Sequence, residues 1–314
     1  MQTIAEILSQ ELGQKQEYVE NVIRLIDEGN TIPFIARYRK EMHGAMDDTT
    51  LRNLETRLTY LRNLEQRRDE VKKSIENQGK LTQELTDAID AAKTMTEVED
   101  LYRPYKQKRR TRGAIAREKG LAPLAAAISA QDGQDPQALA QDYVNKELGV
   151  ATIEDALVGA SDIIAEDLSD SADIRKALRE LVMRRASLVC KAEDSEAESV
   201  YTLYYDFNQP ISRLQDHQIL AINRGEKEGI LKASIVLPGN EGAALVCRAA
   251  LKPQMNVSAF VRTAAEDSFE RLIFPSVQRE VRNELTDRAS QGAIRNFALN
   301  LKPLLMQPPV KGFV

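Results

Sequence analysis

The sequence predicts a mostly α-helical protein, a scaffold of many helices with one long spine helix and at most one small β-hairpin. Apolar residues recur every three or four positions along most of the chain, which is the spacing of an amphipathic helix. A β-type pattern is confined to one short region near residue 235. Only 5% of the 314 residues are aromatic and Trp is absent, so the predicted core is aliphatic.

The chain begins with signals for short helices. Thr3 and Glu6 form a capping-box pattern for a helix that ends at Gly13. A second helix is expected over about residues 15–28. Pro33 stands where a first helical residue is favoured, so a third helix is expected to begin there.

A much longer helix is expected over residues 50–77. Its leucines, continued by valine and isoleucine, form one stripe, while the other face is charged. This pattern is typical of a coiled-coil arm or of one helix of a hairpin. Residues 85–92 predict the return helix.

Residues 101–120, LYRPYKQKRRTRGAIAREKG, form a strongly basic stretch. Eight cations stand against one acid, a local charge of +7 in a chain of net charge −5. Leu101 and Tyr102 are expected to pack as an anchor, and KQKRRTRG, which lacks hydrophobic periodicity, is expected to be an exposed loop. Such a loop can contact several phosphates. The alternative is a solvated loop that neutralises residues 147–174, where eight acids occur without a basic residue.

The second half predicts further helices and the hairpin. Helices are expected near 122–131, 136–147, 153–168, 172–192 and 257–273, and the hairpin would join 230–237 to 243–247 across Pro238. In the last helix, apolar residues recur every fourth position until Pro303 stops or kinks it. The stripe consists of Val277, Val281, Leu285, Ala289, Ala293, Phe297 and Leu301.

An acidic run followed by SVYTLYYDFNQP marks a change of composition at 193–210. We therefore expect a helical domain over 1–198, a helical core segment over 199–310, and the start of another domain at 311–314. VKGFV after a double proline reads like the beginning of a buried strand, so we expect the chain to be the N-terminal part of a longer protein.

No catalytic constellation is found in the sequence. Nucleotide-binding glycine motifs, GxSxG and HExxH are absent, and His43 and His217 are interpreted as structural. Cys190 and Cys247 form no CxxC or disulfide pattern, which favours a reducing cytoplasm. Neither a signal peptide nor a run of 18 apolar residues occurs. The sequence thus predicts no enzyme, metal, cofactor or membrane partner.

Two other stretches are candidates for more than local structure. In residues 32–40, Phe34 is core-like, and cations surround Tyr38, a composition that can stack a base and hold phosphate. The preferred alternative is a helix that packs Tyr38 inward and pairs its arginines with acids. Residues 216–232 are interpreted as a structural helix end.

Three blocks resemble the signatures of the Tex family, the bacterial transcription accessory proteins: IPFIARYRKEMHGAMDD, LYRPYKQKRRTRGAIAREKGLAPLA and HQILAINRGEKEGIL. LMQPPVKGFV resembles the junction into the family's RNase H-like domain. The resemblance implies a cytoplasmic, elongated, multidomain helical protein with a helix-turn-helix-like part and weakly sequence-specific nucleic-acid binding. In the family an OB-fold that lies beyond this region carries most of that affinity. Residues 233–248 match no family block.

The resulting expectation is a non-enzymatic transcription accessory protein that binds RNA, with DNA as a further ligand, at low sequence specificity. RNA polymerase and ribosome-associated machinery are the candidate protein partners. The alternative is a protein-interaction scaffold without nucleic-acid contact, which docks through the leucine stripe of 51–75 and the acidic segment. The candidate contact residues are Lys106, Lys108, Arg109, Arg110 and Arg112, with Arg37, Arg39 and Lys40.

Overall fold

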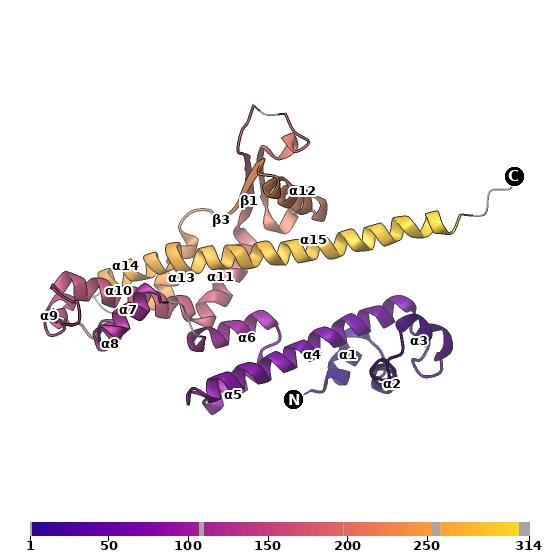
Figure 1. The fold of residues 1–314 in the computed structure, drawn as a ribbon, viewed down its shortest axis with the longest axis horizontal. Coiled ribbons are helices and arrows are strands. Elements are labelled where there is room, and N and C mark those ends of the chain that lie inside the picture. Colours follow the sequence, from indigo (N-terminus) through magenta and orange to yellow (C-terminus); the bar gives the residue numbers. More distant parts are fainter. Residues whose placement is uncertain (1, 107–109, 197, 253–257, 308–314) are drawn as a thin grey trace, which may run out of the picture. The chain divides into compact units, whose positions relative to one another are not determined.

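The computed structural model describes residues 2–106, 110–196, 198–252 and 258–307. It confirms a mostly helical fold with one small sheet (Figure 1). The contacts divide the chain into two compact units, Met1–Tyr105 and Lys106–Val314. Among the described residues, no helix combines the length and apolarity that a membrane span requires.

Helices build the whole described part of the first unit. The capping box of α1 is formed as predicted: the Glu6 amide donates to Thr3 Oγ1 at 3.2 Å, and the Thr3 amide to Glu6 Oε2 at 2.8 Å. Gly13 ends α1 in the left-handed region, at φ 63°. The elements are α1 (Ile4–Leu12), α2 (Gln16–Asp27), α3 (Ile32–Tyr38), α4 (Asp48–Glu76), α5 (Gln83–Ala91), α6 (Met95–Tyr102) and a 3₁₀ turn at Arg103–Tyr105.

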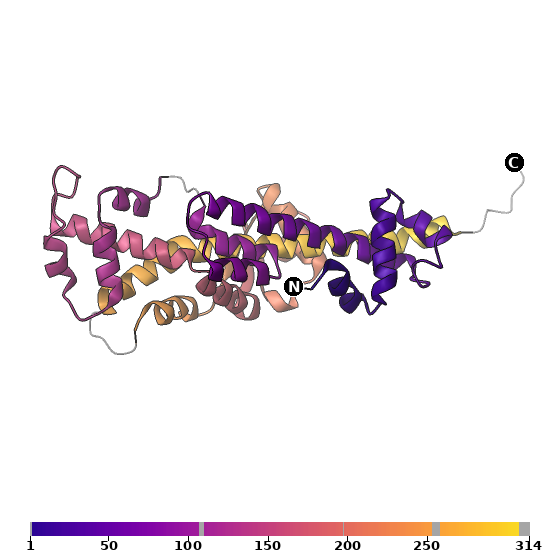
Figure 2. The ribbon, with the colours of Figure 1, turned by 90° about the horizontal axis from the view of Figure 1, so that it is seen from below.

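The predicted leucine stripe lies on α4, which is unbroken in both views (Figure 1; Figure 2). Its first half, from Leu51 to Leu61, packs into a core with α1, α2 and α3. Its second half, from Leu64 to Ile75, packs with α5 and α6. Helices of the same unit therefore cover the stripe, as in a hairpin helix and unlike a coiled-coil arm.

Ion pairs reinforce this packing. Arg57 makes a two-bond contact with Glu11 of α1, at 2.6 and 2.7 Å. Arg62 makes the same kind of contact with Asp27 of α2, at 2.7 and 2.8 Å. Such bidentate pairs fix geometry as well as charge, so they hold α1 and α2 in register on α4.

The second unit combines helices with a three-stranded antiparallel sheet. The helices are α7 (Arg112–Glu118), α8 (Ala122–Ala130), α9 (Pro136–Gln141), α10 (Ile153–Asp170), α11 (Ala172–Arg185), α12 (Asp216–Lys227), α13 (Glu241–Ala250), α14 (Ser258–Asp267) and α15 (Phe274–Leu305). The strands are β1 (Ser187–Ala192), β2 (Asp206–Pro210) and β3 (Leu231–Val236). Short 3₁₀ turns occupy Thr202–Tyr204 and Ile211–Arg213.

The sheet differs from the predicted hairpin. Its order is β2-β1-β3, so β3 pairs with β1, and residues 241–250 form α13 instead of a partner strand. Gly242, Ala243 and Val246 are buried on one helical face of α13. The expectation that helix continues to residue 192 was also wrong, because Leu188 and Cys190 are buried alternately, as in a strand.

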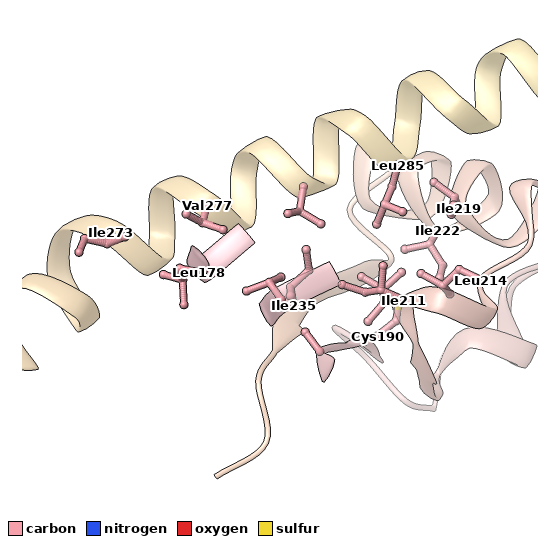
Figure 3. Packing of buried hydrophobic residues seen from close by; sticks show 14 of the residues in the cluster. Leu178, Cys190, Ile211, Leu214, Ile219, Ile222, Ile235, Ile273, Val277 and Leu285 are labelled. Atoms are coloured by element: carbon pink, nitrogen blue, oxygen red, sulfur yellow. The ribbon is translucent and has the colours of Figure 1, made fainter. Parts of the chain in front are cut away.

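The spine helix is confirmed. A π-helical segment, Ser268–Ile273, joins α14 directly to α15. Val277 and Leu285 of α15 point towards Ile222 of α12, Ile235 of β3 and Leu178 of α11 (Figure 3). The predicted stripe is buried only as far as Ala289.

The end of α15 departs from the prediction. Phe297 is 68% exposed and Leu301 is 38% exposed. Pro303 does not stop the helix, which continues to Leu305.

The block HQILAINRGEKEGIL joins α12, β3 and α15, in agreement with its structural interpretation. Arg282 of α15 bonds Glu226 and donates to Asn223 Oδ1 at 2.8 Å. Glu226 Oε1 also accepts from the Ala233 amide at 3.0 Å. Gly225 is needed for close packing, since a Cβ there would lie 2.5 Å from Leu231 Cδ1.

The predicted domain border between residues 198 and 199 lies inside the second unit. There β1, before the border, pairs with β2 and β3, which follow it. The division into 1–198 and 199–310 stays a proposal, and it has to accommodate a core that both segments share.

Candidate nucleic-acid interface

The basic stretch begins as an anchor in the first unit, as predicted. Leu101 and Tyr102 pack against the core formed by α4, α5 and α6. The Tyr102 hydroxyl lies 2.9 Å from Ser74 Oγ, and Gln78 Nε2 donates to the Tyr105 carbonyl at 2.9 Å. The start of the stretch is therefore held by side chains of α4.

The second half of the stretch belongs to the other unit and forms α7, so the last two residues of the predicted loop 106–113 are helical, Arg110 and Thr111 are not, and 107–109 lie outside the described residues. Thr111 caps α7 by accepting from the Ala114 amide at 3.0 Å. Gly113 and Ala116 are buried, and α7 packs on α10. A Cβ at Gly113 would lie 2.4 Å from a Glu166 carboxylate oxygen, so glycine permits this approach.

Part of the basic charge is neutralised internally by the acidic segment. Arg117 bonds both Glu166 and Asp167, and Thr111 Oγ1 donates to Glu166 Oε1 at 2.8 Å. Burial raises the pKa of Asp167, and the charge of Arg117 opposes this rise without cancelling it. The interpretation that the acidic segment neutralises the basic stretch thus holds for Arg117. Lys119 is bound differently, since its Nζ donates to the Gly149 carbonyl at 2.8 Å.

Of the remaining cations of the stretch, Arg103 is half-buried, and the others that are described face solvent. The Arg110 side chain is 73% exposed and lies 3.3 Å from Glu118, itself 61% exposed. An ion pair this exposed contributes little to stability. Arg112 and Lys106 are exposed, and the described residues provide no ion pair for Arg112. Lys108 and Arg109 lie outside the described residues.

The second candidate surface is on α3. Phe34 is 36% exposed and Tyr38 is 57% exposed, so the interpretation that buries Tyr38 was wrong, as was the core assignment of Phe34. The helix instead buries Ile32 and Ile35. Since those two residues define the inward face, positions 34 and 38 are turned outward on the same side.

Three cations lie on α3 and on the two residues that follow it. Arg37, Arg39 and Lys40 are all exposed, and no carboxylate in the described part of the chain pairs with them. The Arg39 guanidinium carbon lies 5.4 Å from the Phe34 ring centroid, a cation–π contact. By contrast, Arg52 on the nearby α4 pairs with Asp48 at 2.8 Å.

The loop after α3 is held against α2. Gly44 and Ala45 both have positive φ, at 60° and 62°, and a Cβ at Gly44 would lie 2.3 Å from the Tyr18 ring. Asn21 Nδ2 donates to the Met42 carbonyl at 3.2 Å. His43 is only 1% exposed, so it belongs to this packed loop and not to a surface site.

The described residues contain no cluster of His, Cys, Asp and Glu that could hold a metal ion. Burial and the nearby Glu226 raise the pKa of the Cys190 thiol to about 11, which disfavours a nucleophilic thiolate. The surfaces described above present exposed cations and exposed aromatic rings.

Comparison with known proteins gives the family. The profile described as Tex-like protein N-terminal domain matches residues 2–76, and the one described as Tex central region-like matches residues 131–297. An uncharacterized protein of Bacillus subtilis, YdcI, is 43% identical over 97% of this chain and 43% of its own length. The transcriptional accessory protein Tex of Neisseria gonorrhoeae is 39% identical over 98% of this chain and 41% of its own.

A more distant relative is human. The S1 RNA-binding domain-containing protein 1 of Homo sapiens is 29% identical over 98% of this chain and 32% of its own length. The chain thus spans less than half the length of these curated relatives. With the central-region profile covering more than half of its residues, the chain belongs to the Tex family of transcription accessory proteins.

Proposed function

We propose that this region binds nucleic acid, RNA foremost and DNA as well, with low sequence specificity and without catalysing a reaction. The observation that carries the proposal is a set of exposed cations without internal acid partners in the described structure: Arg37, Arg39, Lys40 and Arg112. The name of the human relative, which specifies an RNA-binding domain, favours RNA.

Charge supplies the binding energy in this proposal. A protein cation that neutralises a phosphate releases a condensed counterion, and the affinity then falls with salt. The net charge of the whole chain is −5, so the attraction has to come from local surfaces. The described cations Lys106, Arg110 and Arg112 belong to one such surface, and Arg37, Arg39 and Lys40 to the other. Contacts to phosphate carry no sequence information, which accounts for low specificity.

The competing function is a protein-interaction scaffold. Its predicted docking stripe on α4 is not accessible, because Leu51, Leu58 and Leu64 are buried inside the first unit. The end of α15 is a better surface for it, since Ile294 is 70% exposed and Leu305 is 74% exposed. RNA polymerase and ribosome-associated machinery remain the proposed protein partners, and the cytoplasm the proposed location.

Fluorescence anisotropy with labelled single-stranded RNA, single-stranded DNA and duplex, between about 50 and 200 mM salt, tests the proposal. Replacing Arg110 and Arg112 by alanine should weaken binding and flatten the salt dependence by about 0.7 in slope per lost contact on a single strand. The matched control replaces Arg185 and Arg224, exposed arginines of the same unit that pair with Glu241 and Glu228.

The control variant should bind like the unaltered chain. Equal salt slopes for the two double variants would exclude Arg110 and Arg112 from the interface. Failure of the unaltered chain to bind any of the three nucleic acids at low salt would refute the proposed function. Capture of RNA polymerase subunits after nuclease treatment would then favour the scaffold.

A further inference from the structure

We propose that α3 carries a stacking platform for unpaired bases, so that the ligand at this surface is single-stranded nucleic acid. The α3 platform consists of Phe34, Arg37, Tyr38, Arg39 and Lys40. The inference rests on the proposed function and specifies which class of nucleic acid that surface takes.

The rings of the platform are partly accessible to solvent. Phe34 and Tyr38 lie one helical turn apart, with ring centroids 5.3 Å apart and ring planes tilted by 47°. They therefore touch without covering each other as a parallel stack would. With 36% and 57% of their residue surfaces exposed, they offer an aromatic surface next to water on which a base can stack.

The cations of the platform are positioned for the backbone of a stacked nucleotide. Arg39 lies over the Phe34 ring, and its Nη1 donates to the Tyr38 carbonyl at 3.3 Å, which ties the guanidinium to the aromatic pair. Arg37 and Lys40 are exposed within the same short segment. Base stacking combined with nearby positive charge is the usual mode of single-strand recognition.

Buried residues and a constrained loop hold the backbone of the platform in place, so binding requires little further ordering of that backbone. Ile35 is fully buried and fastens α3 into the core with α4. The following loop holds Gly44 and Ala45 in left-handed conformations, and a non-glycine residue such as Ala45 persists there only when its surroundings impose it. A surface that is ordered before binding loses less conformational entropy on binding.

Single strands fit this surface better than duplexes or acidic peptides do. In a duplex the base faces are already stacked on each other and only their edges are accessible, so Phe34 and Tyr38 would have no ring to contact. An acidic peptide would satisfy Arg37 and Lys40 by charge alone and would leave the aromatic pair in water.

The first test replaces the rings by apolar side chains of lower stacking ability. In the full 314-residue chain, F34L/Y38L should reduce affinity for labelled oligo(U) and oligo(dT) by about tenfold or more. Its salt slope should be unchanged because no cation is lost, and its affinity for a duplex of the same length should be unaltered. The charge variant R37A/R39A/K40A should instead lower the slope.

The second test is optical. The chain has no Trp, so Y38W introduces a single indole into the platform. Its fluorescence should be quenched by oligo(dT) and unaffected by polyglutamate or by an abasic strand of equal length. L203W provides the control, because Leu203 is 85% exposed and lies in the other unit.

The outcomes separate the two proposals. If the chain binds oligo(dT) with a normal salt slope while F34L/Y38L binds equally well and Y38W is not quenched, the platform is refuted and the proposed function stands. Quenching of Y38W by polyglutamate would assign the surface to acidic peptides and refute the platform as well. An unaltered chain that binds no nucleic acid refutes both.

Discussion

The ion pair between Arg175 and Glu280 allows a strict test of how the second unit is stabilised. Arg175 is completely buried on α11, and its guanidinium bonds Glu280 on α15. The same guanidinium donates to Ser276 Oγ at 3.3 Å, and Arg179 Nη1 donates to Glu280 Oε2 at 3.2 Å. One carboxylate thus bonds two arginines, one of which has no access to water.

Replacing Glu280 by alanine leaves the buried guanidinium without that carboxylate. Breaking a buried ion pair from one side costs about 3–5 kcal/mol. The Glu280 side chain is 31% exposed, so water can enter its place, and we expect the lower limit, about 3 kcal/mol. For a unit of this size the midpoint of thermal unfolding should fall by about 6–12 °C.

Unfolding can be followed by the reactivity of the two cysteine thiols. This measurement reports on the second unit, because both cysteines lie within Lys106–Val314. Glu284→Ala is the matched control: this acid lies one turn further along α15 and is exposed, so its loss should change stability by less than about 0.5 kcal/mol. Adding Arg175→Met to Glu280→Ala should restore part of the stability, since the buried charge itself is removed. Equal midpoints for the Glu280 and Glu284 variants would refute the reasoning.

Two further predictions concern titration. Hydrogen bonds from Arg57 and Arg62 lower the pKa values of Glu11 and Asp27 below their ordinary values of 4.5 and 3.8. These pairs therefore stabilise the folded first unit at pH values above the ordinary pKa values. The stabilisation disappears as the pH falls through the lowered pKa values of the folded state. Both pairs are exposed, so each contributes at most about 1 kcal/mol to the free energy of unfolding. Urea unfolding followed by circular dichroism between pH 7 and 3 should show a smaller loss of stability for R57Q/R62Q than for the unaltered chain. Equal losses would contradict the assignment. Burial raises the pKa of Cys190 to about 11, so iodoacetamide at pH 8 should label this thiol only after urea unfolding, and rapid labelling of the folded chain, located by peptide mass spectrometry, would contradict its burial.

The local signals of the sequence predicted the helices well. A capping box and a following glycine gave both ends of α1, and the leucine stripe gave α4 within two residues at its start. These features succeed because hydrogen bonds between near neighbours and a period of 3.6 residues are encoded within one segment. The long stripe beginning at Val277 predicted the spine for the same reason.

The strand β1 shows where the local signals stop. Only one residue, Ala186, separates β1 from α11. The six residues SLVCKA are too few to show by themselves whether they extend the helix or form a strand. It becomes a strand because β2 and β3, separated from it in sequence, provide hydrogen-bond partners on both edges. The prediction that β3 pairs with residues 243–247 failed for the same reason, because strand pairing depends on two segments and not on one.

The candidate site divides in the same way. Composition alone placed the cations Arg110, Arg112, Arg37, Arg39 and Lys40 in two short stretches, because charge is a property of each residue. Only the tertiary structure decided which charges are available. Arg117 bonds Glu166, 49 residues away, and the burial of Ile32 and Ile35 turned Phe34 and Tyr38 outward. Burial and pairing depend on which distant segments meet, and no single stretch of sequence contains that information.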